Sequence, residues 1–208
     1  MHVLPCVVCG DLVTMSEDIL SRQPPPANLR LTYGSDSNQF IDLRLPAKEQ
    51  KPWPLVINIH GGFWRAKYNL DHAGHLCAAL AAKGLATANL EYRRVGNEGG
   101  AWPGTFSDIR SAYQFLIQNT EEHHFDSAKV AVVGHSAGGQ LALCLAAHEP
   151  RIRGVLSLAG VVDLRRAYQL HLSRDAVVEF LSGTPAEFRI TIAKRTRCNC
   201  PLQTHVSG

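Results

Sequence analysis

The stretch Gly134-His135-Ser136-Ala137-Gly138 decides how this chain of 208 residues is interpreted. An apolar run, Val130-Ala131-Val132-Val133, precedes it and predicts a buried strand, and residues 140–147 after it predict a helix. A sharp turn from strand to helix forces its middle residue into a strained backbone, and small neighbours leave room for that residue. Ser136 is therefore expected at the carboxyl edge of a sheet, beside the free N–H groups of a helix that starts near Ala137.

A second stretch with chemical content is His60-Gly61-Gly62-Phe63-Trp64, which follows the apolar run Leu55-Val56-Ile57-Asn58-Ile59. Glycines at the carboxyl end of a strand let the backbone approach a ligand closely and direct N–H groups at it. A tight loop would explain these glycines alone, but an oxyanion hole beside a reactive serine needs such donors. Together the two stretches predict a catalytic serine next to an oxyanion hole.

Strands and helices alternate along much of the chain. The predicted strands cover residues 39–45, 55–59, 85–90, 130–133 and 155–159, and the predicted helices cover residues 71–83, 105–119 and 140–147. The period-two alternation of residues 39–45 indicates a half-buried strand. Asp71 is expected to cap the first helix, and Gly84 to end it. Parallel strands need crossover helices, so the pattern predicts an α/β fold with a mostly parallel sheet and helices on both faces.

The composition is that of an ordinary globular domain, with 45% hydrophobic and 19% charged residues. The formal net charge of +3 comes from residues 188–208, which hold four basic residues and no acidic one; the rest of the chain holds 17 basic and 18 acidic residues. No nucleic-acid partner is therefore expected.

Other classes of protein are also disfavoured by the sequence. No run is long and apolar enough to predict a membrane span, and the six cysteines suit neither a disulfide scaffold nor a metal site. The glycines around Ser136 fit neither a phosphate loop nor a dinucleotide fingerprint, so no cofactor is expected. A cytoplasmic location is the expectation that follows.

Both glycine-containing stretches match motifs of one known family. The chain resembles the α/β-hydrolases, and within them the esterase/lipase and kynurenine-formamidase group, whose HGGxW and GHSAGG motifs stand here at residues 60–64 and 134–139. The resemblance extends from about Asp18 to about Glu187 and includes residues 91–94 and 101–104. It implies the α/β-hydrolase fold and a small-molecule ester or amide substrate. It also implies that Ser136 is the nucleophile and that an oxyanion hole is formed by the N–H groups of Gly61, Gly62 and Ala137.

The same resemblance directs attention to the partners of the serine. In this family an acid and then a histidine follow the nucleophile along the chain, and the histidines after Ser136 are His148, His171 and His205. His148 ends the helix after the serine and is expected to point away from it. Asp163, after the strand at 155–159, is the candidate acid. His171 is the candidate base, although the family places cap or packing residues there.

The two ends of the chain depart from the alternating pattern. Residues 1–14 are expected to be a non-structural leader before a second methionine, Met15, and residues 188–208 an irregular basic tail. Residues 15–187 then form an α/β-hydrolase domain without its C-terminal strands. A frameshift or truncation near Phe188 is our hypothesis for this change. Such a loss would leave the strand at 155–159 at an edge of the sheet.

Two functions remain open from the sequence. The first is a serine hydrolase that cleaves a small carboxylic ester or an aryl formamide through an acyl-enzyme on Ser136. The second is a catalytically inactive, truncated protein of the same fold, or a small-molecule binding module, because the family's C-terminal acid and histidine are missing. The sequence determines neither the substrate nor the oligomeric state.

Overall fold

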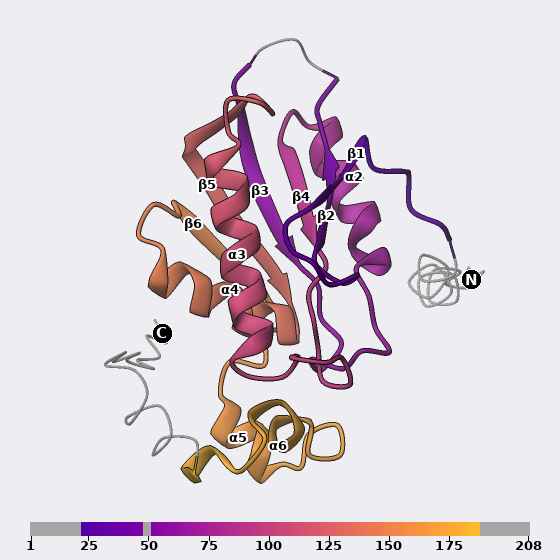
Figure 1. Ribbon diagram of the computed structural model, residues 1–208. Coiled ribbons are helices and arrows are strands. Elements are labelled where there is room, and N and C mark those ends of the chain that lie inside the picture. Colours follow the sequence, from indigo (N-terminus) through magenta and orange to yellow (C-terminus); the bar gives the residue numbers. More distant parts are fainter. Residues whose placement is uncertain (1–21, 48–50, 188–208) are drawn as a thin grey trace, which may run out of the picture.

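The computed structural model describes residues 22–47 and 51–187, and six strands of this part form one sheet in the order β1-β2-β4-β3-β5-β6 (Figure 1). The four strands from β4 to β6 in this order run parallel, and β1 and β2 pair antiparallel with their neighbours. The strands are β1 (Leu29–Thr32), β2 (Phe40–Arg44), β3 (Trp53–Ile59), β4 (Ala86–Leu90), β5 (Phe125–His135) and β6 (Gly154–Leu158).

Helices cover both faces of this sheet, as the sequence predicts. They are α2 (Gly74–Ala82), α3 (Gly104–Gln118), α4 (Ala137–His148), α5 (Leu164–Gln169) and α6 (Ala176–Leu181), with a 3₁₀ turn η1 (Asp71–Ala73) before α2. On one face, Thr87 of β4 donates a hydrogen bond to the Cys77 carbonyl of α2. On the other face α4 packs on β5 and β6, with α3 beside it. Figure 1 shows α5 and α6 together beyond the carboxyl ends of the parallel strands.

The core is centred on β3, which lies between two parallel neighbours. Leu55, Ile57 and Ile59 on one face of β3 are fully buried, and Val56 on its other face is nearly so. A strand buried on both faces reads as a continuous apolar run, which is why the sequence identifies it so clearly. The core position of β3 places residue 60 at the carboxyl edge of the sheet, where the loop predicted to form the oxyanion hole (the oxyanion loop) begins.

The prediction of a half-buried strand at residues 39–45 is wrong about its burial. Residues 41–44 of β2 are buried on both faces rather than one, and the strand pairs antiparallel with β1 and β4. Asp42 of β2 is buried because it has a partner: it forms two hydrogen bonds with Arg30 of β1, at 2.7 and 2.9 Å. Arg44 donates through one nitrogen to the Pro25 carbonyl at 2.7 Å, while its Nε and Nη1 are buried without a hydrogen-bond partner among the described residues. The pairing strand β1 was not predicted at all.

The start of α2 also differs from its prediction. Asp71 lies in η1, and its carboxylate accepts a hydrogen bond from the Asn69 side chain instead of capping the helix. Ala73 occupies the N-cap position of α2 without a side-chain cap. The predicted end of this helix is confirmed, because Gly84 has φ = 96°, a backbone conformation that favours glycine.

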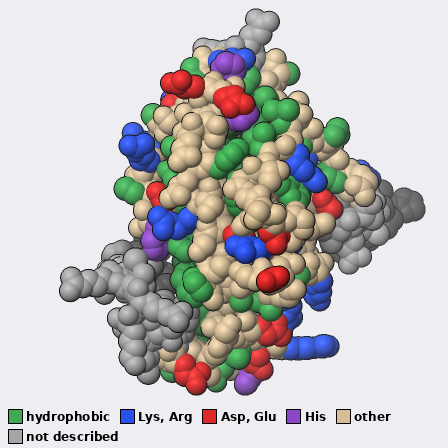
Figure 2. Space-filling model, viewed as in Figure 1, with side chains coloured by type: hydrophobic (Ala, Val, Ile, Leu, Met, Phe, Trp, Pro, Cys, Tyr) green, Lys and Arg blue, Asp and Glu red, His purple; other side chains and the backbone are tan. Residues whose placement is uncertain are grey.

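The strand β6 is at an edge of the described sheet, as expected if no further strand pairs with it there. Its apolar side chains are correspondingly exposed, with Leu156 at 53%. No helix in the described ranges is long and apolar enough to cross a membrane. On the face seen in Figure 2, acidic and basic side chains are scattered among one another and form no large patch of a single sign. The expected leader, Met15 as a start and the expected tail lie outside the described residues.

Candidate active site

The turn between β5 and α4 has the strained geometry that its sequence predicts. Ser136 has φ = 54° and ψ = −118°, a conformation that is costly for a residue with a side chain. A Cβ at Gly134 would lie 2.1 Å from the Gly138 carbonyl oxygen, and a Cβ at Gly138 would lie 2.1 Å from the Ile59 carbonyl oxygen. Only glycine fits at these two positions, so the tight turn depends on both.

Backbone hydrogen bonds hold Ser136 in this strained conformation. Its N–H donates to the Leu158 carbonyl at the end of β6, at 2.8 Å, and its own carbonyl accepts from Gly139 and Val161, at 3.0 and 3.1 Å. Strain of this kind persists only where the surroundings impose it. Ser136 is therefore fixed at the carboxyl edge of the sheet, with its side chain half-buried.

The loop after β3 lies directly against this turn. A Cβ at Gly61 would lie 3.1 Å from Ser136 Cβ and 2.7 Å from the His135 carbonyl oxygen. Gly62 has φ = 113° and is covered by the side chain of Tyr68. Within residues 22–47 and 51–187, the backbone N–H groups of Gly61, Gly62 and Ala137 donate to no protein acceptor. The structure thus brings the predicted oxyanion loop to the predicted nucleophile and leaves these N–H groups free.

We expect Gly61→Ala to lower esterase activity by about 100-fold, because a misplacement of about 1 Å in a catalytic group has an effect of this size. The new methyl group would meet the backbone of His135 and push the oxyanion loop away from Ser136. The measurement is kcat/KM for a chromogenic ester. Gly154→Ala in β6 is the control, since a Cβ there meets nothing within 4 Å. Equal activity of the two variants would contradict the close approach of loop and serine.

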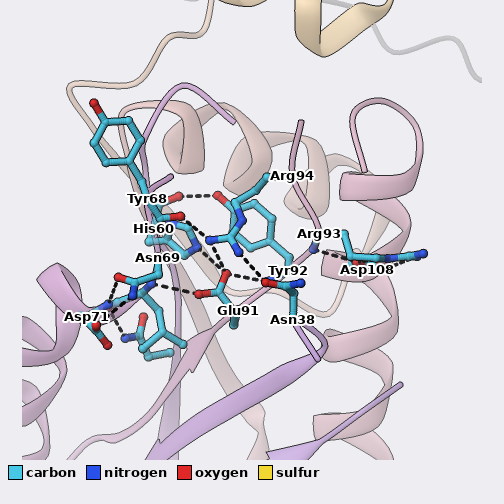
Figure 3. A network of polar contacts seen from close by, with 12 residues as sticks. Asn38, His60, Tyr68, Asn69, Asp71, Glu91, Tyr92, Arg93, Arg94 and Asp108 are labelled. Atoms are coloured by element: carbon cyan, nitrogen blue, oxygen red, sulfur yellow. Dashed lines mark hydrogen bonds and ion pairs between the residues drawn. The ribbon is translucent and has the colours of Figure 1, made fainter. Parts of the chain in front are cut away.

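A buried polar cluster supports the oxyanion loop from behind (Figure 3). His60 is fully buried, and its ring nitrogens lie 2.8 Å from the Gly61 carbonyl oxygen and 3.0 Å from Glu91 Oε1. Glu91 also accepts from the N–H groups of Leu70 and Tyr92 and forms an ion pair with Arg94 at 2.8 Å. Sequence reasoning missed this cluster. The available signal was a charged residue directly after a buried strand, at the same sheet edge as His60.

The environment of Glu91 favours its charged form. Burial by itself raises the pKa of this carboxyl, but the hydrogen bond and charge of His60, the charge of Arg94 and the Tyr92 N–H outweigh burial, so the net pKa is lowered. A lowered pKa in the folded state contributes stability above the pKa of the unfolded chain.

We therefore expect the free energy of unfolding to fall as the pH drops below about 4.5, through the lowered pKa of Glu91. Urea unfolding between pH 3 and 7 measures this dependence. Glu91→Gln should be less stable at pH 7 and should lose less stability on acidification than the wild-type chain. The same pH slope in both proteins would show that Glu91 is not the group that titrates.

The aromatic residues near the two motifs pack against the segment after β6. Trp64 is fully buried and stacks on Phe180 of α6, with ring centroids 4.5 Å apart, and Trp102 meets the same ring edge-on. Arg65 forms two hydrogen bonds with the carboxylate of Glu179, at 2.7 and 3.0 Å. The α5–α6 segment is thus joined to the oxyanion loop by a stacked aromatic pair and an ion pair.

The two candidate triad partners make other contacts. Asp163 caps α5 and accepts from the Arg166 N–H at 2.8 Å. His171 pairs through Nδ1 with Asp175 at 2.7 Å, and both side chains are exposed. In the part of the chain that the structure describes, no histidine forms a hydrogen bond with Ser136. The structure therefore unites Ser136 with the oxyanion loop and leaves the assignment of acid and base a prediction.

A histidine that sequence reasoning missed lies beside the turn. The ring of His72 is edge-on to His135, with centroids 6.4 Å apart, and edge-on to His60 at 5.9 Å. Partial burial and the charges of His60 and His135 lower the pKa of His72. This residue is therefore neutral at pH 7.

The chain is similar in sequence to curated proteins that are named as a formamidase and an esterase. Kynurenine formamidase of Danio rerio is 28% identical over 185 residues, and esterase LipC of Mycobacterium tuberculosis is 29% identical over 130 residues. These matches cover 84% and 61% of this chain but only 60% and 32% of those proteins. The chain therefore spans less than two thirds of the length of these curated relatives.

Solved structures show the same fold. Esterase B of Lactobacillus rhamnosis superposes with a TM-score of 0.65 at 21% identity, covering 86% of this chain and 64% of that chain. A bacterial heroin esterase superposes with a TM-score of 0.60 at 24% identity, covering 75% and 54%. These likenesses confirm the α/β-hydrolase fold. The BD-FAE family model matches residues 41–194, most of the chain, and this protein is accordingly a member of the BD-FAE family.

Proposed function

We propose that the chain is a serine hydrolase of the esterase/lipase type, which cleaves a small carboxylic ester or an aryl formamide through an acyl-enzyme on Ser136. The observation that carries this proposal is the strained Ser136 against a loop whose backbone N–H groups are free. The names of the relatives, esterase and kynurenine formamidase, support the same chemistry.

In the proposed reaction Ser136 Oγ attacks the carbonyl carbon of the substrate, and the carbonyl oxygen becomes an oxyanion. The N–H groups of Gly61, Gly62 and Ala137 stabilise this charge, and the N-terminus of α4 adds a favourable dipole. The proton lost by Ser136 Oγ passes to the leaving group, which departs as an alcohol or arylamine; water then attacks the acyl carbon, releases the acid and returns a proton to Ser136. Oxyanion stabilisation and substrate binding alone can retain roughly 10³-fold catalysis over water. Slow turnover is therefore expected wherever no base reaches Ser136.

Covalent labelling tests this proposal. The folded, monodisperse chain is incubated with a p-nitrophenyl phosphonate, and the adduct is located by peptide mass spectrometry, while hydrolysis of p-nitrophenyl acetate is followed in parallel. We expect one adduct per chain, on the peptide that contains Ser136, and turnover above the buffer rate. Comparison of the ester with an N-formyl arylamine then decides the substrate class. A folded chain that is neither labelled nor active would support the inactive binding module instead.

A further inference from the structure

The two N–H groups that the oxyanion loop offers belong to two successive peptide groups, and the carbonyl end of each accepts a hydrogen bond from a buried side chain. The N–H of Gly61 shares its peptide with the His60 carbonyl, which accepts from the Tyr92 hydroxyl at 2.7 Å. The N–H of Gly62 shares its peptide with the Gly61 carbonyl, which lies 2.8 Å from His60 Nδ1. Both side chains are fully buried.

The hydrogen-bond partner of His60 Nδ1 fixes the role of this nitrogen. A carbonyl oxygen can only accept, so the contact with Gly61 requires a proton on Nδ1. On the other side of the ring, Nε2 lies 3.0 Å from Glu91 Oε1, and Glu91 also accepts from two backbone N–H groups and pairs with Arg94. These contacts hold the imidazole in the orientation in which Nδ1 faces the Gly61 carbonyl.

The surroundings of His60 hold its ring in place. The Tyr92 ring stacks on the imidazole, with centroids 4.5 Å apart and planes 20° apart. The charged or titratable groups around it are Glu91 and Arg94, which follow β4, and His72 of η1 (Figure 3 shows the first two). The packed ring therefore keeps Nδ1 directed at the Gly61 carbonyl.

We propose that Tyr92 and His60 are positioning residues that polarise the oxyanion loop: through the carbonyls of His60 and Gly61 they strengthen the N–H groups of Gly61 and Gly62 as donors. A hydrogen bond at the carbonyl end of a peptide polarises the whole group, and chains of such bonds reinforce one another in a buried site. The preorganised dipoles of these two peptide groups then favour the negative charge that develops in the transition state. This inference rests on the proposed function of Ser136.

A matched pair of tyrosine variants tests the effect on catalysis. Tyr92→Phe removes the hydroxyl that polarises the loop, and Tyr33→Phe removes a hydroxyl that donates to the Glu91 carbonyl, also at 2.7 Å but outside the loop. We expect Tyr92→Phe to lower kcat and the rate of phosphonate labelling about tenfold with KM within about twofold, a smaller loss than complete removal of a donor. Tyr33→Phe should leave both within about twofold. Equal effects of the two variants would overturn the proposal.

Nuclear magnetic resonance tests the same idea without turnover. His60 Nδ1 should carry a proton, and Tyr92→Phe, but not Tyr33→Phe, should shift the amide proton of Gly61 towards a weaker donor. A His60 Nδ1 without a proton or an unshifted Gly61 amide would overturn the proposal. An inactive wild-type chain that still shows both signatures would count against the proposed function and not against the polarised loop.

Discussion

Where a base activates Ser136, Ser136→Ala is expected to lower hydrolysis of p-nitrophenyl acetate by at least about 100-fold, to the residual rate that the oxyanion loop alone can provide. The variant removes the only atom that the proposed acyl-enzyme can form on. It should not disturb the turn, because alanine and serine pay a similar cost for the left-handed backbone at φ = 54°. Initial rates at saturating and subsaturating ester separate a loss in kcat from a loss in binding.

The control for this variant is a serine on α3, the helix that contacts α4. Ser107→Ala, on an exposed position of α3, should leave the rate unchanged. Circular dichroism shows whether both variants fold like the parent chain. If Ser136→Ala keeps the parental rate, ester cleavage does not depend on Ser136 and takes place at another nucleophile. The strained turn would then have no role in the reaction.

The sequence predicts well those parts of the fold whose signal is local. The strand β3 and residues 130–133 of β5 are largely buried and read as continuous apolar runs, and the glycines beside Ser136 mark a turn that excludes a Cβ. By contrast β2 reads as half-polar, because the partner that allows Asp42 to be buried is Arg30 on a strand that the pattern does not reveal. Burial of a charge depends on tertiary pairing, which periodicity does not contain.

The same distinction applies to the site. Ser136 and Gly61 are found from motifs within a few residues, whereas His60 and Glu91 are 31 positions apart and meet only because Ile59 pairs with Leu90 in parallel register. The register of two strands carries each following residue to the same edge of the sheet. The ion pair between Arg65 and Glu179 is likewise long-range, and no local sequence pattern predicts it.

The second large effect is expected on stability. Ile57→Ala should lower the free energy of unfolding by about 2–5 kcal/mol, because the truncation leaves a cavity that the surrounding strands fill only in part. Ile57 is fully buried at the middle of β3, between β4 and β5, where its cross-strand partners are Ala88 and Val132. Urea unfolding followed by circular dichroism measures the loss at constant pH.

Leu170→Ala is the matched control, since this leucine at the end of α5 is 56% exposed, and substitutions at such surface positions usually change stability by no more than about 0.5 kcal/mol. A large difference between the two variants would show that packing around β3 stabilises the fold. Because β3 ends one residue before His60, the same packing would then support the oxyanion loop. Similar small losses would mean that the sheet does not depend on β3, and the rigid placement of Gly61 against Ser136 would then need another support.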